Sequence, residues 1–168
     1  MHIEIIKLKY SDVFSASKMM ADSCRSVYRG IMNDEYLDSI SDDQYVKFLE
    51  TGLNEKAIDC FLAVENLKII GVSITRKSKI DYYPDDAELY AIYLLPNYIG
   101  KGLGRKLYLQ SELLIKQQGY NDMSLVVLAQ NNIAIEFYKR NGYVKTEFST
   151  MVNLKGQELS CDIMRKRL

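Results

Sequence analysis

Residues 88–105 read E-L-Y-A-I-Y-L-L-P-N-Y-I-G-K-G-L-G-R, and this stretch decides the fold. Its first eight residues are mostly apolar and include two tyrosines, which favours a strand that is covered on both faces. Pro96 ends the strand because proline has no N–H to donate to a ladder. Gly100, Gly102 and Gly104 then stand at every second position, before a helix that we expect to begin near Leu103.

Three closely spaced glycines need a physical reason, because glycine loses more conformational entropy on folding than any other residue. Without Cβ atoms, backbone N–H groups can approach an anion closely, and the N-terminus of the following helix adds partial positive charge. The stretch therefore predicts a phosphate-binding loop, with a ligand-free tight turn as the alternative. It matches neither a P-loop, since Arg105 and Lys106 follow Gly104 without a hydroxyl, nor a dinucleotide fingerprint, since Leu107 takes the place of the last glycine.

Length and composition are those of one globular domain, residues 1–168, with 48% hydrophobic and 26% charged residues. Lys plus Arg equals Asp plus Glu, 22 each, so we expect no general attraction to nucleic acid or to anionic membranes. No apolar run approaches about 18 residues, and the first residues, M-H-I-E-I-I-K, do not resemble a signal peptide. A cytoplasmic location is expected.

Cysteine and histidine are too few and too scattered for a metal site or a disulfide framework. The three cysteines, Cys24, Cys60 and Cys161, are odd in number and far apart, which indicates reduced thiols. The single histidine, His2, lies near a terminus and argues against histidine-based catalysis. We expect no metal.

Hydrophobic periodicity predicts the order β-α-α-β-β-β-α-β-α-β-β. The strand–helix–strand unit in residues 88–129 must be a right-handed parallel crossover, so we expect an α/β fold with a mixed sheet and helices on both faces. The expected strands are residues 3–8, 60–64, 69–78, 88–95, 123–129, 143–152 and 159–167, and the expected helices run from about 12 to 25, from 41–43 to about 52, from 103 to 118 and from 132 to 140.

A second motif follows the glycine loop. Residues 131–143 read N-N-I-A-I-E-F-Y-K-R-N-G-Y, in which Asn131, Ala134, Tyr138 and Gly142 fit the pattern N-x-x-A-I-x-x-Y-x-x-x-G-F/Y. Residues 99–104, I-G-K-G-L-G, resemble motif A, Q/R-x-x-G-x-G/A, except that Ile99 replaces the usual Gln or Arg. Together the two motifs, in this order, resemble the GCN5-related N-acetyltransferase (GNAT) family.

The resemblance implies an acetyl-CoA-dependent N-acetyltransferase that acts on a primary amine through a ternary complex. It also implies a mostly antiparallel sheet whose central parallel strand pair splays apart to admit the cofactor arm. In that reading Asn131 bonds the pantetheine and Tyr138 protonates the departing sulfur; as plain structural alternatives, Asn131 is a helix cap and Tyr138 a core residue. The expected cofactor-binding residues are Ile92, Tyr93, Leu94, Gly100, Lys101, Gly102, Leu103, Gly104, Arg105 and Asn131.

The sequence defines the groups that activate and hold the acceptor amine less clearly than it defines the cofactor-binding residues. Glu88 is the candidate base, with a strand-start carboxylate paired to solvent or to a lysine as its alternative, and Tyr90 competes with it for lining the amine site. Two readings stay open for the aromatic and acidic residues elsewhere: a mouth for a cationic amine such as a polyamine, or a solvated loop. These residues are Tyr28, Tyr36, Tyr45, Asp81, Tyr82, Tyr83, Asp85 and Asp86.

The acceptor itself is left open by the sequence. A polyamine, another small amine, a protein N-terminus or an amino sugar would each fit. A non-catalytic coenzyme A sensor is the alternative function, and a homodimer also stays open.

Overall fold

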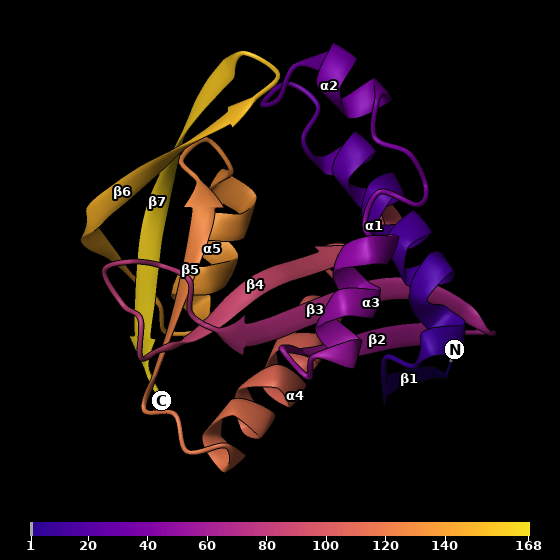
Figure 1. Cartoon of the computed structure of the whole chain (residues 1–168), viewed down its shortest axis with the longest axis horizontal. Coiled ribbons are helices and arrows are strands. Elements are labelled where there is room, and N and C mark those ends of the chain that lie inside the picture. Colours follow the sequence, from indigo (N-terminus) through magenta and orange to yellow (C-terminus); the bar gives the residue numbers. More distant parts are fainter. Residues whose placement is uncertain (1) are drawn as a thin grey trace.

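A single seven-stranded sheet forms the centre of the protein, which we describe from a computed structural model covering residues 2–168 (Figure 1). The strand order is β1-β2-β3-β4-β5-β7-β6. Only β4 and β5 run parallel, and all other neighbouring strands run antiparallel. The predicted mixed sheet is confirmed. Its strands are β1 (Ile3–Lys7), β2 (Ile58–Glu65), β3 (Lys68–Lys77), β4 (Ala87–Leu94), β5 (Asp122–Leu128), β6 (Val144–Leu154) and β7 (Gln157–Arg167).

Helices cover both faces of this sheet. Leu62 packs with α1 and α3 on one face, while its neighbours Phe61 and Ala63 pack with α4 on the other. This is why β2 is an almost unbroken apolar run: a strand covered on both sides needs no polar alternation. The helices are α1 (Val13–Val27), α2 (Asp34–Asp38), α3 (Val46–Asn54), α4 (Leu103–Gln117) and α5 (Asn132–Arg140), and two short 3-10 turns occupy Tyr10–Asp12 and Pro96–Tyr98.

The central strands β4 and β5 separate soon after they meet. They pair only at Ala87 with Met123 and at Glu88 with Ser124. On its other edge, β4 continues to pair with β3 as far as Leu94. The register with β3 shifts there and leaves Tyr90 as an extra residue. Such a β-bulge bends the strand that carries it, which accounts for the departure of β4 from β5.

The β6–β7 hairpin reaches across the end of the sheet to α1 and α2 (Figure 1). In its tip, the Gln157 side chain accepts a hydrogen bond from the backbone N–H of Asn33 at 2.7 Å and donates one to the carbonyl of Ile31 at 3.2 Å. Lys155 Nζ donates to Ser39 Oγ at 2.9 Å. These contacts join the two ends of the chain over the splayed strands.

One helix differs from the sequence expectation. Residues 34–38 are not among the expected helices, but they form α2, whose first turn is capped by the Asn33 side chain accepting from the Glu35 N–H at 2.8 Å. A five-residue helix is too short to show a 3.6-residue period, so pattern reading misses it. Within residues 2–168, no helix has the length and apolar character needed to cross a membrane.

Candidate active site

The glycine loop joins the end of β4 to α4 and needs its glycines for backbone reasons. Gly100 and Gly102 have φ of +79° and +78°, a region that L side chains rarely adopt. A Cβ on either residue would meet no protein atom within 4 Å, so this side of the loop is open. Gly104, by contrast, lies against Phe137 and Leu94, which would approach its Cβ to 3.4 and 3.5 Å.

The N-terminus of α4 presents main-chain donors to the same open side. Gly102 is the N-cap and makes no side-chain cap, and the first turn carries no acidic residue. The first backbone hydrogen bond of the helix is donated by the Lys106 N–H to the Gly102 carbonyl oxygen, at 3.2 Å. The N–H groups of Leu103, Gly104 and Arg105 therefore have no helical acceptor and are oriented to bind an anion.

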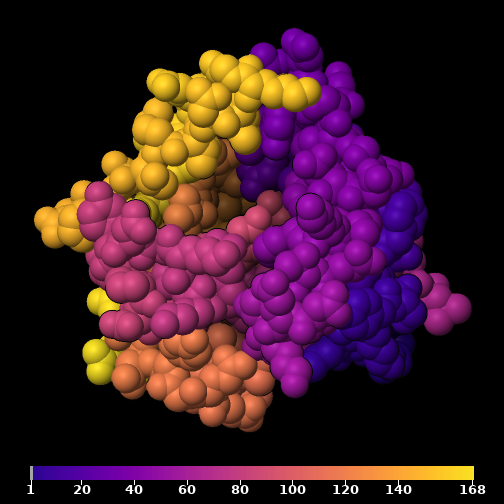
Figure 2. Space-filling view, viewed as in Figure 1, coloured from indigo at the N-terminus to yellow at the C-terminus, as the bar shows by residue number. Residues whose placement is uncertain are grey.

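A cavity of about 700 Å³ lies where β4 and β5 have separated. The glycine loop and α5 form one end of it, and α1 with the loop before α3 forms the other. The space-filling view shows a hollow between the yellow β6–β7 hairpin and the purple helices (Figure 2). Main-chain groups of residues 89–94 that face β5 have no ladder partner there, so an extended ligand can hydrogen-bond to them.

Tyr138 projects from α5 into this cavity. Its side chain is buried, and in residues 2–168 its hydroxyl has no hydrogen-bond partner. Burial, together with the neighbouring Tyr28, raises the pKa of the Tyr138 phenol well above its usual value. The group is therefore a protonated donor at neutral pH, and it is not committed to any other acceptor.

Asn131 is a helix cap and also lines the cavity. As the N-cap of α5, its Oδ1 accepts from the Ala134 N–H at 3.2 Å. The residue also lines the cavity, and its amide nitrogen makes no hydrogen bond within the described part of the chain. The cap fixes the side chain while leaving its N–H₂ group to donate to a ligand.

Glu88 is placed differently from the expectation that made it the candidate base. Its two carboxylate oxygens form a bidentate pair with Arg76, at 2.9 Å each, and Oε2 also accepts from the Lys79 N–H at 3.0 Å. The residue is buried and does not line the cavity. A carboxylate held in this way acts as a structural partner for Arg76, which in turn lies over the Tyr90 ring at 4.2 Å.

Most of the expected cofactor-binding residues meet at the cavity. It is lined by Ile92, Tyr93, Leu94, Gly100, Gly102, Gly104, Arg105 and Asn131. The side chains of Lys101 and Leu103 do not line it: Leu103 is buried against β2 and β3, and Lys101 Nζ lies over the Tyr98 ring at 5.8 Å. These two residues can contribute only main-chain N–H groups.

The expected aromatic and acidic mouth divides into two separate regions. Tyr28, Tyr36 and Tyr45 line the cavity. The loop at residues 81–86 does not, and it is also not a freely solvated loop. Arg165 on β7 forms a bidentate pair with Asp86 at 2.8 and 2.9 Å and lies over the Tyr83 ring, so the loop is anchored to the hairpin.

Sequence reasoning missed the side chains that close the cavity. Cys24 on α1, Phe137 and Arg140 on α5, and Val152 and Leu154 on the hairpin all line it. The second motif could have pointed to α5, since Phe137 and Arg140 flank Tyr138. No signal in the sequence places a C-terminal hairpin over an N-terminal helix.

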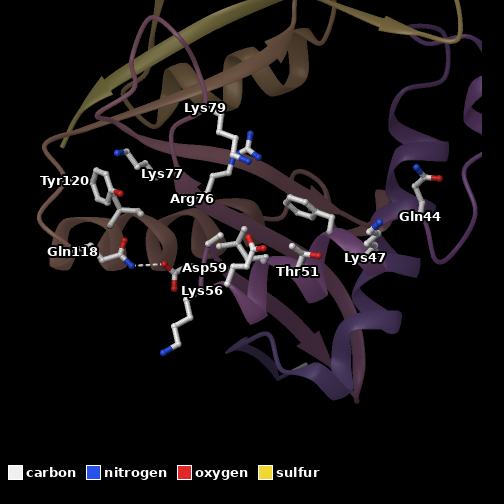
Figure 3. A pocket seen from close by; sticks show the side chains of 16 residues that line it. Gln44, Lys47, Thr51, Lys56, Asp59, Arg76, Lys77, Lys79, Gln118 and Tyr120 are labelled. Atoms are coloured by element: carbon white, nitrogen blue, oxygen red, sulfur yellow. Dashed lines mark hydrogen bonds between the residues drawn. The ribbon is translucent and has the colours of Figure 1, made fainter.

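A second cavity, of about 880 Å³, lies between α3 and the C-terminal end of α4 (Figure 3). It has five basic side chains, but they do not converge. Lys77 and Lys79 lie at one end and Lys47 at the other, while Lys56 points away (Figure 3). No glycine loop reaches it, so we place the functional site in the cavity between β4 and β5.

Comparison with known proteins agrees with this geometry. The sequence model of the acetyltransferase (GNAT) family matches residues 23–143. A spermidine N(1)-acetyltransferase from Thermoplasma acidophilum is 31% identical over 149 residues, which are 85% of this chain and 89% of the relative. The uncharacterized N-acetyltransferase YuaI from Bacillus subtilis is 28% identical over 138 residues, which are 82% of this chain and 78% of the relative.

Among solved structures, the crystal structure of PaiA N-acetyltransferase from Thermoplasma acidophilum in complex with coenzyme A matches with a TM-score of 0.80 and 26% identity. The match covers 100% of both chains. The family match spans β4, the glycine loop and α5, which carry both sequence motifs. This chain therefore belongs to the GNAT acetyltransferase family.

Proposed function

We propose that residues 1–168 form a single N-acetyltransferase domain that transfers the acetyl group of acetyl-CoA to a primary amine of a small molecule. One observation carries the proposal: the ladder between β4 and β5 ends after Glu88, and the cavity that results runs to the glycine loop at the start of α4. An extended pantetheine arm and a pyrophosphate match those two features. The coenzyme A complex of the PaiA relative supports the same cosubstrate.

The loop and the splayed strand hold the cosubstrate in this proposal. Main-chain N–H groups of residues 100–105 bind the pyrophosphate, helped by the α4 N-terminus. Main-chain groups of residues 92–94 bind the arm and the acetyl oxygen, as donors that stabilise the oxyanion of the tetrahedral intermediate. The Asn131 amide adds a hydrogen bond to the arm.

The chemical step is direct attack by the neutral amine on the thioester carbonyl. A C–N bond forms, the C–S bond breaks, and the sulfur leaves as a thiolate. Tyr138 donates its phenolic proton to the sulfur, and the proton released by the nitrogen restores the phenol, so the products are an amide and a neutral thiol. Glu88 has no part in this transfer, because both of its oxygens are held by Arg76.

In this proposal the protonated amine gives its first proton to bulk water as it enters the cavity and is desolvated. An alkyl amine has a pKa of about 10.4 in water, and burial disfavours its charged form. No carboxylate lines the cavity in residues 2–168 to oppose that effect. The neutral nucleophile therefore forms inside the cavity without a dedicated base.

Amine-dependent release of free thiol tests the function. Purified protein incubated with acetyl-CoA and a panel of primary amines is expected to release one thiol for each amide formed, as followed by a thiol-reactive dye and by mass spectrometry of the product. The opposing hypothesis is a coenzyme A sensor. Tight binding of coenzyme A with no release above the amine-free control, across the whole panel, would favour the sensor.

A further inference from the structure

The end of the cavity away from the glycine loop is built mainly from tyrosines. It lies between α1, the start of α3 and the bulged part of β4. Apolar side chains, such as Met32 and Ile40, complete it. The five tyrosines are Tyr28, Tyr36, Tyr45, Tyr90 and Tyr93.

These tyrosines are neutral hydroxyl groups. Burial raises the pKa of Tyr28 to about 12, and it also raises the pKa of Tyr45 and of Tyr93. The Tyr45 hydroxyl and the Cys24 thiol lie 3.2 Å apart and hydrogen-bond to each other, and burial raises the pKa of that thiol too. This part of the wall therefore offers rings and hydroxyls, and no negative charge, at neutral pH.

No acidic side chain lines the cavity in residues 2–168, and its charged lining residues are Arg105 and Arg140. Glu35 on α2 is exposed and does not line the cavity, and four other acids near this end are already paired. Asp22 and Asp42 bind Arg25 at 2.6 and 2.7 Å. Asp34 and Asp38 both bind Arg29. None of these four carboxylates is left to neutralise a cationic ligand.

This arrangement selects against a polyamine. A polyamine carries several positive charges at neutral pH, and each charge moved into a buried site without a counter-ion costs several kcal/mol. A compound with one amine avoids that cost, because desolvation favours the neutral form that reacts. The rings then contact an apolar or aromatic body.

The β6–β7 hairpin also limits the size of the acceptor. The two hydrogen bonds of Gln157 to residues 31–33 hold its tip against the loop between α1 and α2, and Val152 and Leu154 line the cavity. A peptide chain would need an open groove at this position. The hairpin instead forms a wall of the cavity there.

We propose that the acceptor is a small primary monoamine with an apolar or aromatic body, and not a polyamine. This proposal rests on the acetyltransferase activity proposed above. It separates this chain from its Thermoplasma acidophilum relative, which is named as a spermidine N(1)-acetyltransferase. The proposal is based on a tyrosine-lined acceptor pocket that no carboxylate lines in residues 2–168.

The test compares 2-phenylethylamine and hexylamine with spermidine. We expect kcat/KM with acetyl-CoA to be at least about tenfold higher for the monoamines, a difference of about 1.4 kcal/mol. Calorimetric titration of each amine into protein saturated with coenzyme A should give the same ranking without turnover. Equal or better kcat/KM for spermidine, or tighter binding of it, would overturn the proposal.

A matched pair of variants isolates the effect of a negative charge in the tyrosine-lined pocket. Met32→Glu places a carboxylate in the tyrosine-lined pocket, and Met32→Gln places a neutral group of the same shape there. We expect Met32→Glu to raise the ratio of spermidine to 2-phenylethylamine kcat/KM about tenfold relative to Met32→Gln. An unchanged ratio in two folded variants would contradict the proposal.

The outcomes distinguish this proposal from the function on which it depends. If the protein does not bind coenzyme A, or releases no thiol with any amine, the acetyltransferase function fails. If thiol is released and spermidine is the better substrate, the function stands and only the acceptor assignment fails.

Discussion

Replacement of Tyr138 by phenylalanine is expected to lower kcat for amine acetylation about 100-fold, which is within the usual contribution of a positioned acid. The substitution removes only the hydroxyl, and that hydroxyl has no hydrogen-bond partner in residues 2–168 whose loss would disturb the fold. Affinity for coenzyme A should stay within about twofold, because the ring remains in the cavity wall. Steady-state kinetics and calorimetry on the same protein measure both quantities.

Tyr143→Phe is the matched control. Tyr143 is also buried and lies next to Tyr138, with ring centroids 5.9 Å apart. Within residues 2–168 its hydroxyl is buried without a hydrogen-bond partner, and it does not line the cavity. We expect kcat to be unchanged in this variant. Unchanged kcat in Tyr138→Phe would remove Tyr138 from the mechanism, and an equal loss in both variants would indicate disturbed packing.

Glu88→Gln is expected to have the largest effect on stability. The substitution keeps the shape of the side chain but leaves the Arg76 guanidinium, whose side chain is 15% exposed, without its counter-charge. Breaking a buried ion pair costs about 3 kcal/mol or more. For a chain of this size that corresponds to a fall in Tm of about 6–12 °C. Thermal unfolding followed by circular dichroism measures it.

Two controls accompany this variant. Glu136→Gln breaks an exposed pair with Lys139 and should leave Tm unchanged. The double variant Glu88→Gln with Arg76→Gln removes both charges and should recover part of the lost stability. A Tm of Glu88→Gln equal to that of the unsubstituted protein would contradict the structural role.

The same variant also tests the chemical role of Glu88. Well below its Tm, folded Glu88→Gln should retain kcat within about threefold, because the carboxylate lies outside the cavity lining. A loss of about 100-fold in the folded protein would instead restore Glu88 as the base. Stability and kcat therefore give separate answers from one substitution.

Local signals were sufficient to predict the elements that carry the cofactor site. The apolar run ending at Pro96, the three glycines and the stripe of apolar residues after Leu103 each have a local physical cause, and all three features appear in the structure. The second motif likewise predicted α5, the helix that carries Tyr138. These features depend on neighbours in sequence.

Features that depend on strand register could not be predicted in this way. The bulge at Tyr90 appears only when β4 is aligned with β3, and that alignment also brings Arg76 opposite Glu88. A strand-start glutamate looks the same in sequence whether it faces solvent, substrate or an arginine. Glu88 was therefore chosen as the candidate base from its residue type alone. The sequence does not show that Arg76, twelve residues earlier, pairs with it.

The residues that line the acceptor end of the cavity also depend on contacts between distant parts of the chain. The loop at residues 81–86 has the composition of a cationic-ligand site, but Arg165 holds it against the hairpin, outside the cavity. Three tyrosines from the N-terminal region line the cavity instead, under a hairpin from the C-terminal end. Composition alone does not predict that arrangement.

We propose that main-chain N–H groups of residues 100–105 bind the pyrophosphate of coenzyme A. Gly102→Ala tests it, and Gly119→Ala is the matched control. Both glycines have positive φ, +78° and +88°, and neither has an atom within 4 Å of a built Cβ. The two alanines therefore impose a similar backbone strain, but only Gly102 lines the cavity.

Calorimetric titration with coenzyme A is the most direct measurement. We predict at least about tenfold weaker binding for Gly102→Ala, a loss of about 1.4 kcal/mol, and unchanged affinity for Gly119→Ala. Equal affinity in all three proteins, or no binding of coenzyme A to the unsubstituted protein, would contradict the account.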